Sequence, residues 1–150
     1  MSVFPTKILV ATDGSREAQL AARTATELAN STNSEVHVVY VGRIYLAAAD
    51  DEPLRSQYEE LEHGWQRVLD KQVRKLEGGG ATVARAHLRM GPREEEEIVA
   101  LAEEIGAGLI VMGSRGLGGI RRVLMGGVSD SVVRHAHCPV LVVREPSREG

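Results

Sequence analysis

Short apolar runs alternate with longer segments of helical periodicity along the whole chain. The apolar runs are 7–11, 35–41, 81–88, 109–112 and 139–143. In the segments between them, 16–30, 54–76, 91–105 and 128–135, apolar residues recur every three or four positions. Strands that alternate with helices predict an α/β fold, in which a parallel sheet carries helices on both faces. The near-continuous apolar strands fit burial on both sides.

The ends of these elements have recognisable signals. The residues TDGS at 12–15 predict a turn that also supplies a helix N-cap, and 42–53 is expected to be a loop. The three glycines at 78–80 predict the end of the long second helix. Pro92 suits the first turn of the third helix, where the acidic residues 94–97 complement the helix dipole.

Composition excludes several classes of protein. The chain has 150 residues, which predicts a single domain over 1–150. A net charge of -3 and an aromatic content of 3% argue against nucleic-acid binding. The single cysteine excludes an internal disulfide. The sequence has neither a signal-peptide pattern nor an apolar run long enough for membrane insertion, so a cytoplasmic protein is expected.

The stretch GSRGLGGIRRVLMGG at 113–127 has six glycines and three arginines, and it follows the apolar run 109–112. Ligands of open α/β sheets bind beyond the carboxyl ends of strands. Successive glycine N–H groups can form an anion-binding nest, and the next helix points its N-terminus at the same place. The stretch lacks the Walker A pattern, and GxGxxG is expected in the first strand–helix unit. The spacing is instead Gly113-x2-Gly116-x9-Gly126.

Together with KILVATDGS at 7–15, the sequence GSRGLGGIRRVLMGGVSDSVVRHAHCPVLVV resembles the universal stress protein family over 7–144. Members that bind nucleotides carry G-x2-G-x9-G-[ST] after the fourth strand. The resemblance implies an open five-stranded sheet in the order 3-2-1-4-5, which is Rossmann-like and similar to adenine nucleotide alpha hydrolases. It also implies a stress-response module that binds ATP with Mg²⁺. The implied homodimer forms partly through 139–143, where pairing would cover an apolar edge strand.

The resemblance assigns roles to individual residues. Asp13 would contact the ribose or adenine side of the nucleotide, and Ala11 would line the adenine pocket. Val41 would offer its backbone to the adenine edge, and Met112 with Gly113 would close the pocket. The residues implied to cradle the phosphates are Gly113, Arg115, Gly116, Gly126, Gly127 and Val128, with a hydroxyl from Ser129. No catalytic residue and no protein-held metal are expected.

Gly127 departs from the family pattern, which has Ser or Thr at this position. The missing hydroxyl removes a hydrogen bond to a charged group, which is worth about 1.5–3 kcal/mol, or about tenfold to a hundredfold in affinity. The backbone nest remains, and Arg115, Arg121 or Arg122 would be the cations that compensate. Arg121 and Arg122 otherwise read as an ordinary surface pair.

Three functional alternatives stay open. The first is a true ATPase or phosphotransferase, although no residue is evidently placed to activate water and hydrolysis is expected to be slow. The second is an interaction protein without a nucleotide, which Gly127 favours. The third is a preference for AMP or cyclic AMP, because the lost hydroxyl matters most for distal phosphates. Asp13 also fits a simple turn residue.

Other conspicuous residues have ordinary explanations. The run 94–97 is expected to be a helix start facing water. His135, His137 and Cys138 are potential zinc ligands, but no second pair has metal-ligand spacing. His135 fits the last turn of a helix, and Cys138 fits a small buried hydrophobe. Tyr58 and Trp65 lie on the apolar stripe of the long helix, where core packing is expected.

Overall fold

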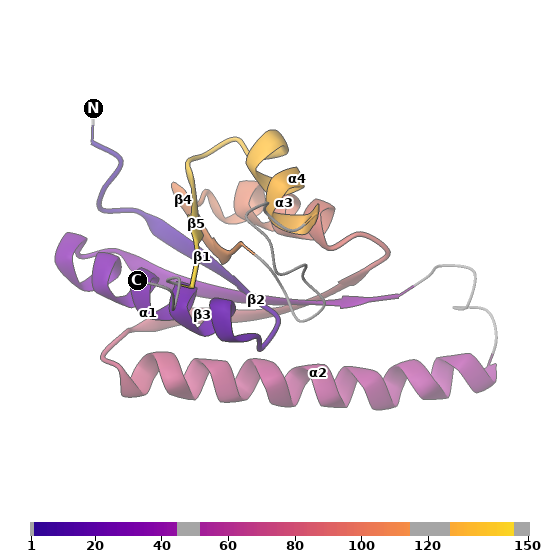
Figure 1. Ribbon diagram of the computed structural model, residues 1–150. Coiled ribbons are helices and arrows are strands. Elements are labelled where there is room, and N and C mark those ends of the chain that lie inside the picture. Colours follow the sequence, from indigo (N-terminus) through magenta and orange to yellow (C-terminus); the bar gives the residue numbers. More distant parts are fainter. Residues whose placement is uncertain (1, 45–51, 115–126, 146–150) are drawn as a thin grey trace.

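The computed structural model describes residues 2–44, 52–114 and 127–145 (Figure 1). Within these residues, strands and helices alternate as predicted. Their order is β1 (Lys7–Thr12), α1 (Arg16–Thr32), β2 (Glu35–Arg43), α2 (Glu52–Gly78), β3 (Val83–Gly91), α3 (Glu94–Ile105), β4 (Leu109–Gly113), α4 (Gly127–His135) and β5 (Val140–Val143). No helix of this described part is both long and apolar enough to cross a membrane.

All strand pairs are parallel, and the sheet has the order β3-β2-β1-β4-β5, which confirms the prediction. The chain builds outward from β1 to β3 on one side and then from β4 to β5 on the other. The strand order therefore reverses between β1 and β4. Pairing of β1 with β2 ends at Thr12 and Tyr40, whereas β2 continues to Arg43 alongside β3. At the carboxyl edge, the end of β2 therefore extends past the end of β1, next to the point where the strand order reverses.

The two faces of the sheet bury separate apolar clusters. Helices α1 and α2 cover one face, and α3 and α4 cover the other (Figure 1). The first cluster joins Ile8, Val10, Val36 and Val38 to the alanine stripe of α1 and to Leu69 and Leu76 of α2. The second cluster, called here the α3–α4 cluster, comprises Leu9, Ala11, Val39, Ile98, Leu101, Ala102, Ile110, Met112 and Val132. The small alanine side chains let α1 approach the sheet closely.

Several predicted boundaries are wrong because strand pairing extends further than local sequence suggests. β2 runs to Arg43, into the segment predicted as a loop, and α2 already begins at Glu52. β3 continues to Gly91, which pairs with Arg43 and keeps the chain extended. As a result α3 begins at Glu94, after the N-cap Arg93, and Pro92 lies before the helix instead of in its first turn.

Gly42, near the end of β2, packs directly against the indole of Trp65 on α2. A Cβ atom at Gly42 would overlap the six-membered ring of Trp65, so only glycine fits at this contact. Trp65 is half-buried, and Val68, one turn further along α2, lies 3.2 Å from the position of a Cβ at Gly14. The predicted packing role of Trp65 is thus confirmed, and its contact surface is the carboxyl end of the sheet.

We expect Gly42→Ala to destabilise the protein by about 1–3 kcal/mol, because the added methyl group overpacks the contact with Trp65. Gly64→Ala is the matched control, because its added Cβ would have Arg67 Nη2 as its nearest neighbour, at 3.9 Å. Replacing a glycine inside a helix at an open position should stabilise by about 0.5–1 kcal/mol. Urea unfolding measures both changes. Equal effects of the two substitutions would contradict the packing argument.

Candidate functional site

The candidate site lies at the carboxyl edge of the sheet, where the strand order reverses. β1 ends there at Thr12, β2 at Arg43 and β4 at Gly113, and α4 begins nearby at Gly127. This is the position at which open α/β sheets bind ligands. Of the residues predicted for this site, Arg115, Gly116 and Gly126 lie outside the described residues, as do Arg121 and Arg122.

Four of the predicted residues meet at one apolar cluster. Ala11 and Met112 are buried members of the α3–α4 cluster, at the ends of β1 and β4. Val41 from β2 and Val128 from α4 are partly buried and pack against the same cluster. Side chains from four separate elements therefore belong to one apolar cluster at the carboxyl edge, to whose apolar surface the partly buried Val41 and Val128 contribute. Ligand sites for flat ring systems are typically lined by such apolar side chains.

Asp13 begins the turn that leads from β1 into α1. Its Oδ1 accepts a hydrogen bond of 2.8 Å from the backbone N–H of Ser15, and the N–H of Gly14 donates to Thr12 Oγ1 at 3.2 Å. Ser15 then caps α1 by accepting from the N–H of Ala18. Gly14 has φ +81°, a left-handed conformation that favours glycine. The turn fixes the half-exposed Asp13 carboxylate beside the apolar surface.

Sequence reasoning missed an ion pair that adjoins Asp13. Arg43 Nη2, at the end of β2, donates to Glu94 Oε1, in the first turn of α3, at 3.1 Å. Burial raises the pKa of Glu94; Arg43 opposes this rise, and the negative charge of Asp13 adds to it. Burial and then Asp13 and Glu94 raise the pKa of Tyr40. The expectation that the run 94–97 faces water holds fully only for Glu96, because Glu94, Glu95 and Glu97 are partly buried and Glu94 pairs with Arg43 at the sheet edge.

Two predicted glycines have different surroundings. A Cβ at Gly113 would lie 2.8 Å from Glu17 Cβ and 3.0 Å from the Glu17 backbone carbon, so close packing of α1 on β4 requires glycine there. Gly127 is exposed, and a Cβ there would meet no atom of the described residues within 4 Å. None of these residues would obstruct a serine side chain at Gly127.

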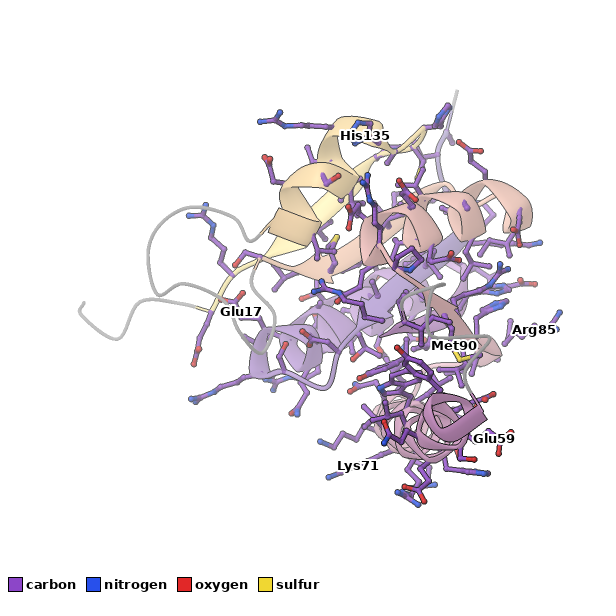
Figure 2. The ribbon with its side chains drawn as sticks, turned by 90° about the vertical axis from the view of Figure 1, so that its right-hand side faces the viewer. Glu17, Glu59, Lys71, Arg85, Met90 and His135 are labelled. Carbon is purple, nitrogen blue, oxygen red and sulfur yellow. The ribbon has the colours of Figure 1, made fainter. Side chains whose placement is uncertain are left out.

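A buried carboxylate, Glu17, also escaped the sequence analysis. Glu17 is only 5% exposed, and its carboxylate accepts hydrogen bonds from Ser114 Oγ at 2.5 Å and from the Glu145 N–H at 3.2 Å. Figure 2 shows Glu17 on α1, on the opposite side of the molecule from Arg85. The position of Glu17 in the first turn of α1 could have drawn attention to this residue in the sequence, because helix N-termini favour negative charge. Its partners come from more than 90 residues away and could not be inferred locally.

Ser129 extends this network to α4. It is buried, and its Oγ donates to the backbone carbonyl of Ser114 at 2.9 Å. The network of Glu17, Ser114 and Ser129 therefore joins the starts of α1 and α4 to the end of β4. The predicted contact of the Ser129 hydroxyl with a phosphate stays a prediction.

The His135–Cys138 segment forms local contacts. His135 lies in the last turn of α4, as predicted, and its Nδ1 is 2.8 Å from the carbonyl oxygen of Ser131. His137 Nε2 lies 2.8 Å from Glu103 Oε1. Cys138 is half-buried and packs against the α3–α4 cluster, and burial raises the pKa of its thiol.

Loss of the Ser114 hydroxyl should leave the buried Glu17 carboxylate short of a donor. We expect Ser114→Ala to lower the free energy of unfolding by about 1.5–3 kcal/mol. Ser131→Ala removes a hydroxyl from an exposed contact with His135 and should change it by less than about 0.5 kcal/mol. Chemical denaturation of both variants checks this. A Ser114→Ala variant as stable as the control would show that Glu17 does not depend on the bond.

Comparison with known proteins supports the fold described above. Residues 5–144 match the model of the universal stress protein family. Universal stress protein MJ0531 of Methanocaldococcus jannaschii is 37% identical over 147 residues, which cover 95% of this chain and 84% of the relative. The solved structure of hypothetical protein MJ0577 has a TM-score of 0.82 at 27% identity and covers 96% of this chain and 99% of its own. A universal stress protein of Archaeoglobus fulgidus in complex with dAMP has a TM-score of 0.65 at 24% identity, covering 95% and 99%.

Proposed function

Because the chain belongs to the universal stress protein family, we propose that it is a stress-response module that binds an adenine nucleotide, with ATP and Mg²⁺ as the leading ligand. One observation carries the proposal: Ala11, Val41, Met112 and Val128, from four elements, belong to one apolar cluster at the carboxyl edge, and the turn that carries Asp13 follows directly after β1 at that edge. The dAMP complex of the Archaeoglobus protein is too distant to transfer its ligand and supports only the fold.

The adenine ring would pack on the apolar surface and use the backbone of β2. The N–H of Glu35 donates to the carbonyl of Thr6, so odd-numbered residues of β2 direct their backbone groups toward β1. By this alternation the carbonyl of Val41 points toward the β1 side of β2. Tyr40 is the last residue of β2 that pairs with β1, so the Val41 carbonyl lies beyond the end of that pairing. In the proposal that carbonyl accepts a hydrogen bond from the adenine amino group.

The ribose would lie against Asp13. Its carboxylate is oriented by the Ser15 N–H and can accept hydrogen bonds from ribose hydroxyls. Arg43 and Glu94 border this end of the site, and Arg43 offsets one of the two nearby carboxylate charges. Because Arg43 compensates Glu94, a nucleotide whose ribose lies against Asp13 would not bring its phosphates next to two uncompensated carboxylates.

The phosphates would bind toward the N-terminus of α4. The first N–H groups of a helix lack partners within the helix and attract anions. Gly127, the first residue of α4, is exposed, and no other part of the described chain lies within 4 Å of a Cβ built there. Mg²⁺ would arrive with ATP, because it typically binds substrate phosphates and water together with few protein ligands.

Gly127→Ser tests this assignment directly. The added hydroxyl is not obstructed by the described residues and should strengthen Mg-ATP binding by about tenfold to a hundredfold, because it donates to a charged phosphate. AMP binding should gain less, since its single phosphate lies nearer the ribose. Isothermal titration calorimetry of wild type and variant with both nucleotides measures the difference.

Gly78→Ser is the matched control for that titration. It also adds a serine at an exposed glycine with nothing within 4 Å, but at the end of α2. Its affinity should equal that of the wild type. Binding only by Gly127→Ser would favour a function through protein partners in the natural chain. Stronger binding of AMP than of ATP would favour the monophosphate, and binding of neither by any variant would contradict the proposal.

We also propose that the protein forms a homodimer through β5. All four residues of this edge strand, Val140–Val143, are apolar and half-exposed. The carbonyls of Pro139 and Val143 accept from Ile110 of β4 and from Ser114, the residue after β4, so the backbone groups of Val140 and Val142 point outward. A second copy of β5 could pair there and remove an aggregation-prone edge.

Val142→Pro should weaken this dimer without disrupting the sheet. Proline removes an outward-pointing N–H, so the hydrogen bonds between β4 and β5 remain. We expect a monomer of unchanged circular dichroism in analytical ultracentrifugation, at concentrations where the wild type is dimeric. A variant that stays fully dimeric would contradict pairing through β5.

A further inference from the structure

Ser114, the residue that follows β4, has its N–H, its carbonyl and its hydroxyl all hydrogen-bonded. The N–H donates to the carbonyl of Val143 at 2.9 Å, the carbonyl accepts from Ser129 Oγ at 2.9 Å, and the hydroxyl donates to Glu17 Oε2 at 2.5 Å. These partners belong to β5, α4 and α1, and Ser114 itself is 3% exposed. Ser114 is therefore a buried junction that fixes the end of β4 relative to these elements.

Glu17 is the charged member of this junction. It lies in the first turn of α1, and its other oxygen, Oε1, accepts from the Glu145 N–H at 3.2 Å (Figure 2). A buried carboxylate is costly unless hydrogen bonds compensate for the lost water. Hydrogen bonds to a carboxylate are also about twice as strong as those between neutral groups. Glu17 therefore holds the Ser114 hydroxyl more firmly than a neutral side chain would.

Ser129 carries this placement to the start of α4. It is the third residue of that helix and is 3% exposed, and Val132, nearly one turn further, is fully buried in the α3–α4 cluster. Apolar contacts such as those of Val132 have no preferred direction, whereas a hydrogen bond fixes both distance and angle. The position of the first turn of α4 therefore depends on the bond from Ser129 Oγ to the Ser114 carbonyl.

The same bond limits what the Ser129 hydroxyl can do. A hydroxyl has one proton, and this one is directed at the carbonyl of Ser114. While the bond exists, Ser129 cannot give that proton to a phosphate. Its contribution to anion binding would instead be to place the backbone N–H groups at the start of α4, which lack partners within the helix.

We propose that Glu17 is a positioning residue for the phosphate end of the candidate site. Through Ser114 and Ser129 it sets where the N-terminus of α4 lies relative to the end of β4. Binding groups must be held to within about 0.5 Å of their productive places, and a buried network of this kind can do so. Because phosphates are proposed to bind at this N-terminus, the role of Glu17 rests on the proposed function.

The charge of Glu17 and its positioning bonds have opposite effects on phosphate binding. A carboxylate repels phosphates, so a Glu17 that acted through its charge alone would weaken ATP binding, and its neutralisation would strengthen it. Loss of the positioning bonds would instead move the start of α4 and weaken ATP binding. The sign of the change in affinity therefore distinguishes the two roles.

The test is a pair of calorimetric titrations, with Mg-ATP and with adenosine, of the full wild-type chain and of Glu17→Gln. A glutamine side chain has one acceptor oxygen, so it cannot serve both donors that Glu17 serves. We expect the Mg-ATP affinity to fall by about tenfold or more, which corresponds to the loss of one hydrogen bond to a charged group. The adenosine affinity should not change, because adenosine has no phosphate.

Glu27→Gln is the matched control, because it removes the same charge from an exposed position on the same helix. It should leave both affinities unchanged. Ser114→Ala breaks the same link from its other end and should reproduce the selective loss of Mg-ATP affinity. Melting curves establish that each variant folds, and Ser114→Ala carries the test if Glu17→Gln does not.

Backbone amide NMR of the ligand-free proteins gives a readout that does not depend on nucleotide binding. Glu17→Gln should shift the signal of Gly127, the first residue of α4, and leave those of Gly80 and Gly106 in place. An unshifted Gly127 signal would overturn the proposal. So would an unchanged or higher Mg-ATP affinity, or equal losses for Mg-ATP and adenosine. A wild type that binds neither ligand would contradict the proposed function itself and remove this role of Glu17 with it.

Discussion

The unequal lengths of neighbouring parallel strands create the candidate site. β1 leaves the sheet after Thr12, whereas β2 continues to Arg43 with support from β3. This difference leaves the end of β2 beside the turn that carries Asp13, next to the point where strand order reverses. The apolar surface below comes from residues that the core already requires. Binding would therefore need few dedicated side chains.

The stability of this edge depends on contacts that cross long sequence distances. Glu17 holds the end of β4 and the segment after β5, and Ser129 attaches the start of α4 to the same point. Gly42 and Trp65 fix α2 against the end of β2. The elements around the site are thus fastened to one another by buried polar bonds and close packing. A ligand there would meet a largely preformed surface.

The alternating strands and helices were predictable because each has a distinct apolar period. The sheet order followed from the family resemblance and is confirmed. Boundaries were less predictable, because the pairing of Arg43 with Gly91 extends β2 and β3 beyond their local signals. Glu17 and the Arg43–Glu94 pair escaped prediction for the same reason, since their partners are distant in sequence. Gly113 and Gly127 also have different surroundings: close packing on Glu17 requires glycine at 113, whereas none of the described residues crowds a Cβ at 127.

The central claim is that an adenine nucleotide binds at the carboxyl edge of β1, β2 and β4. Backbone amide NMR during a titration with ATP and Mg²⁺ tests it most directly, because it locates the ligand without any substitution. The account predicts shifts at Ala11, Asp13, Val41 and Gly127 and unchanged signals at Gly80 and Gly106, which follow α2 and α3 at the opposite edge. An unchanged spectrum, or shifts confined to residues away from the carboxyl edge, would contradict it.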